Sequence, residues 1–210
     1  MKYKRYILLP SFDTNSYLLW DEVSREAMLI DPSAPGEIVV DEINNNKLNL
    51  CYIVNTHGHG DHIGGNKYFK QLFPQTKLCI HKEDEMMLVK SDLNLSLYYE
   101  QETISPKADL LLAEGAVLAL GEKIVTVIHT PGHTRGGVSL FCENLLFSGD
   151  TLFQENIGRT DLPGGNYSQL ISSIQKKLFI FPEETVVLPG HADETTIGTE
   201  KRTNIYAAIN

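Results

Sequence analysis

The chain has 210 residues, of which 42% are hydrophobic and 21% are charged. This composition excludes an intrinsically disordered chain and is sufficient for one domain with a sizeable core, or at most two small ones. The net charge of −9, from 18 Lys and Arg against 27 Asp and Glu, argues against a general binder of phosphate backbones or anionic membranes.

Three cysteines, Cys51, Cys79 and Cys142, lie far apart and form no CxxC pair. We expect buried, reduced thiols in strands rather than a zinc ribbon or a disulfide framework. The amino terminus is charged like a signal peptide, but its apolar stretch, Tyr6–Leu9, is too short for one. No apolar stretch approaches the length of a spanning helix. We therefore expect a cytoplasmic protein with no membrane partner.

The first third of the chain alternates short apolar runs with turns, which is typical of strands. An amphipathic pattern over Gly36–Asn46 predicts a helix. The predicted strands are Tyr3–Leu9, Ser16–Trp20, Ala27–Ile30 and, as a continuous and therefore buried run, Leu50–Val54.

The middle of the chain is expected to hold helices over Gly65–Phe73 and Lys82–Val89, with a strand over Lys77–Ile80 between them. The segment Ser91–Lys107 has no clear period and includes Pro106. We interpret it as an insertion packed on the surface near the functional site.

The second half repeats the pattern of the first, from strands to polar loops and then to a helix. Its clearest helix is Tyr167–Leu178, with an apolar stripe and Asn166 as its predicted cap. Two such βα halves would meet across a shared site. The other predicted elements are strands over Ala116–Leu118, Lys123–His129, Val138–Cys142, Leu145–Ser148 and Thr185–Leu188 and a last helix over Glu200–Ala208.

The most informative segment is HGHGDH at His57–His62, which follows the predicted strand Leu50–Val54. Imidazole nitrogens suit zinc, iron and related metals, and a carboxylate completes a mixed nitrogen and oxygen site. The two glycines allow tight turns in which neighbouring side chains converge instead of alternating outward. Such a loop can divide its side chains between two ions, with His57 and His59 on one and Asp61 and His62 on the other.

Three more predicted strands end in a glycine that is followed at once by a histidine or an aspartate. They are TPGHT with His133, SGDT with Asp150 and PGH with His191. Loops at strand ends are held by a rigid sheet, and catalytic residues are concentrated there. One such turn alone would be ordinary, but together with HGHGDH the three predict a common metal site.

HxHxDH, TPGHT, SGDT and PGH, in this order and spacing, resemble the metallo-β-lactamase superfamily over nearly the whole chain. The resemblance implies an α/β fold, a four-layer αββα sandwich with a metal site at one edge between two sheets, as a single domain over residues 1–210. It also implies the ligand sets, which are His57, His59 and His133 for a first ion, Asp61, His62 and His191 for a second, and Asp150 bridging both.

Within the superfamily, the chain is most similar to the short bacterial members of the glyoxalase II branch, the hydroxyacylglutathione hydrolases. This similarity is carried by SGDTLF at Ser148–Phe153, GRTDLPGG at Gly158–Gly165 and TTIGTEKRTN at Thr195–Asn204. Since the sequence ends at Asn210, we expect the C-terminal helical domain of long members to be missing, and Ile205 stands where short members tend to have proline. The thiol carrier could therefore differ from glutathione.

The resemblance implies a metal-dependent hydrolase that cleaves a thioester such as S-lactoylglutathione. Two divalent ions about 3.5–4 Å apart can share a hydroxide and lower the pKa of bound water toward ~7, so no Ser, Cys or Lys nucleophile is needed. The hydroxide would attack the thioester carbonyl, with Asp150 bridging the ions and Asp61 orienting the nucleophile. Five His and two Asp ligands without Cys suit zinc, with iron or manganese as alternatives.

Arg159 is the candidate substrate-binding residue. It follows the Asp150 loop closely, and a guanidinium there could bind a carboxylate of the thiol carrier through two parallel hydrogen bonds. In the alternative interpretation, Arg159 pairs with Asp161 and fixes the loop. The expected partner is a small-molecule acyl-thiol, with no nucleic acid.

Several rival functions share the same pattern. A persulfide dioxygenase would use one iron held by His57, His133 and Asp150, although the continuation Leu162–Gly164 favours the hydrolase. The net charge of −9 argues against a nuclease, and His59, in the place of a glutamate, argues against a flavodiiron-type module. A non-catalytic scaffold is expected to have lost ligands, and none is missing. A secreted β-lactamase is disfavoured because no signal peptide is visible.

Overall fold

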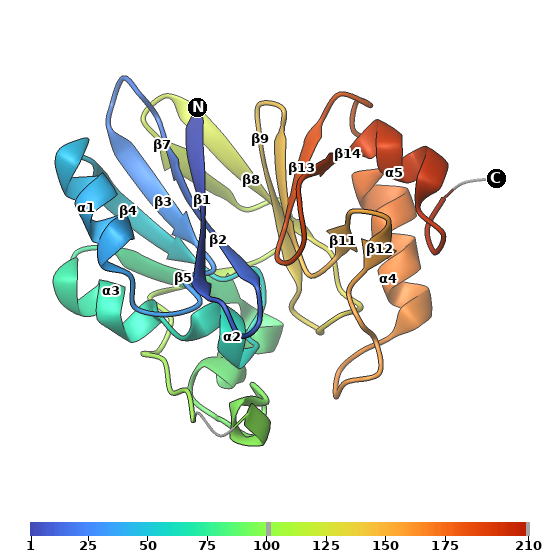
Figure 1. Ribbon diagram of the computed structural model, residues 1–210, viewed down its shortest axis with the longest axis horizontal. Helices are drawn as coiled ribbons and strands as arrows, with labels where there is room; N and C mark the ends of the chain where they lie inside the picture. The colour runs from blue at the N-terminus through green and yellow to red at the C-terminus, as the bar shows by residue number, and fades with distance from the viewer. Residues whose placement is uncertain (100–101, 209–210) are drawn as a thin grey trace.

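Two six-stranded sheets stacked face to face, with helices on their outer faces, form the four layers of the computed structural model (Figure 1). The structure describes residues 1–99 and 102–208. This architecture confirms the predicted α/β sandwich.

The first sheet is built from the amino-terminal half of the chain. It runs antiparallel over its first three strands and parallel from the third to the sixth. The sequence did not predict the short sixth strand, because its three consecutive leucines show no alternation of apolar and polar residues. The order of strands is β1 (Lys2–Leu9), β2 (Thr14–Trp20), β3 (Glu26–Ile30), β4 (Asn49–Val54), β5 (Lys77–His81) and β6 (Leu110–Leu112).

The second sheet is built from the carboxy-terminal half. Its neighbouring strands are antiparallel except for one parallel pair, β10 with β13. The order is β14 (Thr195–Thr196), β13 (Val186–Pro189), β10 (Leu145–Gly149), β9 (Val138–Cys142), β8 (Lys123–His129) and β7 (Val117–Leu120), and a separate ribbon joins β11 (Leu152–Phe153) to β12 (Asn156–Ile157).

The helices differ from the prediction mainly at their ends and in their type. The expected helix over Lys82–Val89 is a 3-10 helix, Lys82–Leu88, and the insertion holds a second one, Ser96–Tyr99, before residues 100–101, which lie outside the described residues. The predicted helix Tyr167–Leu178 ends in a π turn over Ile174–Leu178. The α-helices are α1 (Glu37–Asn45), α2 (Gly60–Ile63), α3 (Asn66–Leu72), α4 (Tyr167–Ser173) and α5 (Ile197–Thr203).

The last helix corrects a prediction, because it begins at Ile197 and ends at Thr203 instead of spanning Glu200–Ala208. The side chain of Thr196 accepts a hydrogen bond from the backbone N–H of Thr199 and caps the helix three residues earlier than expected. The buried Asn204 then ends it, donating to Glu200 and to the carbonyl of Asn156. The TTIGTEKRTN segment thereby ties α5 to the β11–β12 ribbon.

Strand β2 shows how both faces of a sheet are buried. All of its residues are buried, and successive side chains of a strand point to opposite faces. Tyr17 and Leu19 therefore join the core between the sheets, while Leu18 and Trp20 pack under the helices α1 and α3. Each such side chain contributes roughly 1.5–3 kcal/mol of burial free energy, so the sandwich supplies a rigid support for its edge loops.

The cysteines lie in strands, as predicted. Cys79 and Cys142 are buried and Cys51 is partly buried, and all three are free thiols. Among the helices of the described residues, none has both the length and the apolar character needed to cross a membrane.

Candidate metal centre

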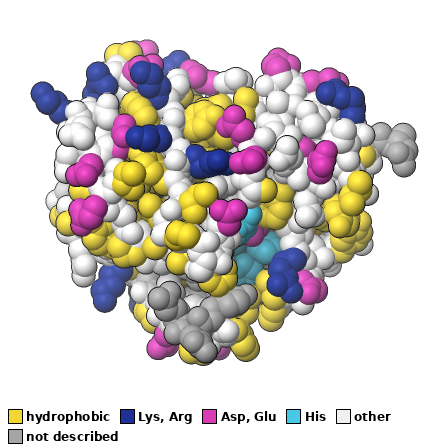
Figure 2. Space-filling model, in the orientation of Figure 1, with side chains coloured by type: hydrophobic (Ala, Val, Ile, Leu, Met, Phe, Trp, Pro, Cys, Tyr) yellow, Lys and Arg dark blue, Asp and Glu magenta, His cyan; other side chains and the backbone are white. Residues whose placement is uncertain are grey.

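Four loops from the two sheets converge at one edge of the sandwich. They follow β4, β8, β10 and β13, and histidine side chains reach the surface there in a hollow between the two halves of the molecule (Figure 2). The loops bring together all of the residues predicted as metal ligands, which are His57, His59, Asp61, His62, His133, Asp150 and His191.

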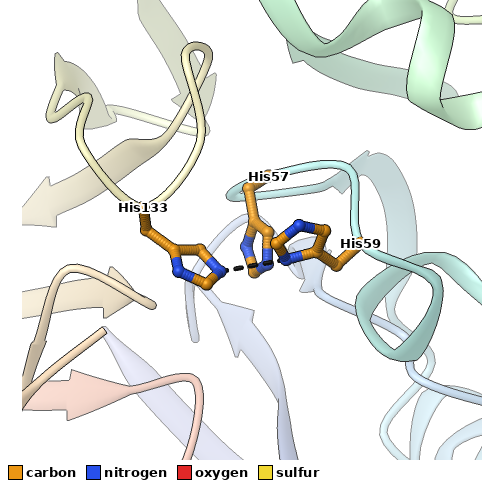
Figure 3. A group of neighbouring side chains, drawn as sticks. All are labelled: His57, His59 and His133. Carbon is orange, nitrogen blue, oxygen red and sulfur yellow. Dashed lines mark hydrogen bonds between the residues drawn. The ribbon is translucent and has the colours of Figure 1, made fainter. Parts of the chain in front are cut away.

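The first ligand group consists of His57, His59 and His133, whose rings point toward one another (Figure 3). Nδ1 of His59 lies 3.0 Å from Nε2 of His133. Nε2 of His57 is buried and has no hydrogen-bond partner among the described residues. In a tetrahedral zinc site with nitrogen ligands at about 2.1 Å, neighbouring ligand atoms are about 3.4 Å apart. The nitrogen atoms of this group therefore fit a bound metal ion.

The second ligand group consists of Asp61, His62 and His191. Nε2 of His62 lies 3.3 Å from Nε2 of His191 and 3.4 Å from Oδ2 of Asp61. The same Asp61 oxygen lies 3.5 Å from Nε2 of His191. Three donor atoms at this spacing fit a second ion.

Asp150 lies between the two groups. Its Oδ2 atom is 3.4 Å from Nε2 of His133 in the first group and 3.5 Å from Nε2 of His191 in the second. Its Oδ1 atom is 3.5 Å from Nε2 of His62 and is buried without a hydrogen bond to any described residue. A buried polar atom left unpaired costs about 1–3 kcal/mol, so Asp150 is suited to serve cations held by both groups.

Three of the histidines direct their outer nitrogen, Nδ1, to an oxygen acceptor and their inner nitrogen, Nε2, to the centre. An N–H that donates outward leaves the lone pair of the other nitrogen facing inward, which is the arrangement that metal-binding histidines require. The Nδ1 contacts are His62 with Oδ2 of Asp31 at 3.0 Å, His133 with the carbonyl of Arg159 at 2.7 Å, and His191 with the carbonyl of Phe12 at 3.1 Å.

Asp31 is a site residue that the sequence analysis missed. It is buried and accepts hydrogen bonds from N and Oγ1 of Thr56 at 2.7 and 2.6 Å as well as contacting His62. Asp31, His57 and His62 are also close enough together to hold an ion. Because both oxygens of Asp31 are already paired, we assign it to orienting His62. The available signal was an apolar strand followed at once by an aspartate, as at Asp150.

The start of β2 supports the second group, and nothing in the sequence pointed to it. The hydroxyl of Thr14 donates to Oδ2 of Asp61 at 3.0 Å. The buried side chain of Asn15 donates to the carbonyls of Pro189 and Ala192 at 2.9 and 2.8 Å, on either side of the last histidine. These contacts hold the two loops of the second group at the amino-terminal hairpin.

The two groups differ in protonation when no ion is bound. Burial, together with the other imidazoles, lowers the pKa of His59 to about 3 and that of His57 well below its usual range. Burial also lowers the pKa of His62, but the carboxylates of Asp61, Asp150 and Asp31 outweigh it and raise that pKa to about 10. An ion bound by the second group therefore displaces a proton, whereas His57 and His59 are already neutral.

Arg159 lies at the rim of the hollow and is paired with Asp161. Its Nε and Nη2 atoms donate to the two carboxylate oxygens at 2.8 and 2.9 Å, which lowers the pKa of Asp161 to about 2. The hollow has a volume of about 240 Å³, and Phe12, Leu95 and Leu162 line it beside the metal-site side chains. The pairing with Asp161 is the one that the alternative interpretation predicted, and a contact of Arg159 with a substrate stays a prediction.

Comparison with known proteins shows which family the chain belongs to. The family model described as the metallo-beta-lactamase superfamily matches residues 9–191. Hydroxyacylglutathione hydrolase GloC of Haemophilus influenzae is 36% identical over 210 residues, which cover 95% of each chain. All seven predicted ligands and the strands from β2 to β13 lie within residues 9–191, which the family model matches.

Three solved structures share the fold. BLEG-1, described as a B3 metallo-beta-lactamase, has a TM-score of 0.91 at 37% identity and covers 98% of this chain and 99% of its own. The di-iron-bound form of TTHA1623 has a TM-score of 0.85 at 32% identity, covering 97% and 99%. ETHE1 from Myxococcus xanthus has a TM-score of 0.80 at 29% identity, covering 99% and 85%. This chain belongs to the metallo-beta-lactamase superfamily.

Proposed function

We propose that the chain is a hydrolase of the glyoxalase II branch that cleaves a thioester such as S-lactoylglutathione at a centre of two divalent ions. The observation that carries this proposal is the position of Asp150, whose carboxylate lies within 3.5 Å of imidazole nitrogens from both ligand groups. A shared carboxylate suits two ions held close together. The likeness to the hydroxyacylglutathione hydrolase of Haemophilus influenzae supports a thioester as substrate.

The donor set defines what the centre would hold. In this proposal the first group binds one ion, the second group binds the other, and Asp150 contacts both. Such ions lower the pKa of bound water toward ~7 and polarise a carbonyl, which supplies the nucleophile and the charge stabilisation that thioester hydrolysis needs. Nitrogen and oxygen donors suit zinc, with iron or manganese as alternatives, and the di-iron form of TTHA1623 supports iron.

The residues around the centre orient the reacting groups. Thr14 donates to Oδ2 of Asp61, which holds this carboxylate where we expect it to orient the attacking water. A hollow of about 240 Å³ accepts a small acyl group and leaves most of a larger thiol carrier at the surface. Arg159 at its rim would bind a carboxylate of that carrier by exchanging Asp161 for it.

The proposed function also has consequences for the domain organisation, location and partner of the protein. We propose a single domain, located in the cytoplasm, whose partner is a small acyl-thiol and not a nucleic acid. The net charge of −9 supports the exclusion of nucleic acid, because phosphate backbones select basic surfaces.

Metal content and S-lactoylglutathione cleavage, measured on one purified sample, test the proposal. We expect close to two ions per chain, thioester cleavage, and loss of cleavage after chelation that added zinc, iron or manganese restores. Arg159→Ala should raise KM more than it lowers kcat if the guanidinium binds substrate. Full activity in the metal-stripped protein would contradict the proposal.

A persulfide dioxygenase is the second candidate, and it is favoured by the likeness to ETHE1 from Myxococcus xanthus. One iron per chain, held by His57, His133 and Asp150, with oxygen uptake on glutathione persulfide would replace the hydrolase assignment. A chromogenic cephalosporin belongs in the same assay series because BLEG-1 is described as a B3 metallo-beta-lactamase. Cleavage of the cephalosporin without thioester cleavage would also replace the proposed substrate.

A further inference from the structure

A buried carboxylate outside both ligand groups connects the two loops of the first group. Asp84, in the 3-10 helix Lys82–Leu88, is 1% exposed. Its Oδ2 atom accepts from the backbone N–H of Gly58 at 3.2 Å and from the hydroxyl of Thr134 at 2.7 Å. Its Oδ1 atom accepts from the backbone N–H of Gly136 at 2.7 Å.

The groups that donate to Asp84 lie next to the ligands of the first group, in both of the loops that carry them. Gly58 lies between His57 and His59 in the loop after β4, and Thr134 directly follows His133 in the loop after β8. The two loops come from different sheets, and no strand pairing in the described part of the chain fixes the distance between them, although one backbone hydrogen bond, from the N–H of Val138 to the carbonyl of Thr56 at 2.8 Å, links their bases. A carboxylate that accepts from both loops can fix it.

The 3-10 helix approaches both loops more closely than side chains would permit. A Cβ atom on Gly136 would lie 2.6 Å from Cγ of Asp84, and one on Gly58 would lie 2.5 Å from Cβ of Met87. Since only glycine fits at both positions, the loops rest directly against this helix. The sequence around the two ligand motifs is thus adapted to close contact with the 3-10 helix that carries Asp84.

We propose that Asp84 is a positioning residue for the first metal position, holding His57 and His59 at the distance from His133 that an ion requires. The side chains of the second group are held by other partners, which are Asp31, Thr14 and the carbonyl of Phe12. Loss of the Asp84 carboxylate therefore weakens the first position and leaves the second intact. The inference rests on the two-ion centre proposed above.

The test is the zinc affinity of each position, measured by competition with a chromophoric chelator. A His191→Ala background isolates the first position and a His59→Ala background isolates the second. Asp84→Asn keeps the shape of the side chain but turns one acceptor oxygen into an N–H donor that faces another donor. We expect zinc binding at the first position to weaken about 10–100-fold, with a change below about threefold at the second.

Two further comparisons separate positioning from folding. Asp109→Asn is the matched control, since Asp109 also accepts from a backbone N–H and a side chain, those of Leu78 and Lys70 at 2.8 Å each, and it should leave zinc affinity unchanged. Thr134→Val removes one donor and should weaken the first position several-fold, whereas Thr134→Ser keeps the hydroxyl and should restore it. These two variants decide the question if Asp84→Asn does not fold.

The outcomes distinguish the two proposals. A folded Asp84→Asn protein that binds zinc at the first position as tightly as the unmodified chain overturns the role of Asp84 and leaves the proposed function standing. Equal weakening at both positions also overturns it, because the effect would then be general destabilisation. A wild-type chain that binds no metal overturns the proposed function and this inference together.

Discussion

Replacing His81 by asparagine should make the stability of the protein less sensitive to acid. His81 is 2% exposed and stacks on His129, with ring centroids 4.1 Å apart. Its Nδ1 atom accepts from the backbone N–H of Glu83 and caps the 3-10 helix. Burial and the neighbouring imidazole lower the pKa of His81 from 6.5 to about 4. Asparagine can provide the same cap without titrating.

The sign and size of the effect follow from proton linkage. Because the pKa is lower in the folded state, the unfolded chain takes up a proton first as the pH falls. The stabilising contribution of neutral His81 is therefore complete above pH 6.5 and is lost as the pH falls toward 4. The shift from 6.5 to about 4 corresponds to a total loss of about 3 kcal/mol, of which about 2 kcal/mol is lost by pH 5.

Urea unfolding at pH 7.5 and at pH 5, on equally zinc-loaded samples, measures this loss. Other groups also titrate over this range. The informative quantity is therefore the difference between the two proteins in the free energy of unfolding that each loses between pH 7.5 and pH 5. We expect the His81→Asn variant to lose about 2 kcal/mol less than the wild type over this pH range. Equal losses in the two proteins would refute the assignment of a neutral, buried His81.

Three further substitutions test the centre and the core. Asp150→Asn should bind fewer ions per chain and reduce thioester cleavage on the order of 100-fold or more, and unchanged metal content by elemental analysis would contradict its shared position. Gly190→Ala would place a Cβ atom 2.2 Å from Oδ1 of Asp150, so zinc affinity should fall about 10–100-fold; retained affinity in a chelator competition would show that the loop adjusts freely. Leu170→Ala, in the core under α4, should lower the free energy of unfolding by about 2–5 kcal/mol without changing metal content, which urea unfolding with metal analysis can check.

Local patterns in the sequence were sufficient for most of the fold. Apolar runs bounded by turn residues predicted the strands around β2 and β4, because hydrophobic periodicity reports directly which face of an element is buried. The same approach was weaker at element ends and for helix type. The capping contact of Thr196 and the 3-10 helix Lys82–Leu88 depend on hydrogen bonds and packing that periodicity does not record.

The candidate ligands could be named from the sequence because each lies in a short glycine-containing segment that follows a predicted strand, so their chemistry was visible locally. The residues that hold these ligands in place could not be named from the sequence. Asp31 lies 31 positions from His62, and Asp84 lies 50 positions from Thr134. A single buried aspartate is locally indistinguishable from a turn residue. The pairing of β3 with β4 brings Asp31 to His62, and the stacking of the two sheets brings Asp84 to Thr134. Neither contact can be seen locally, because the partner of a buried polar atom is decided by long-range packing.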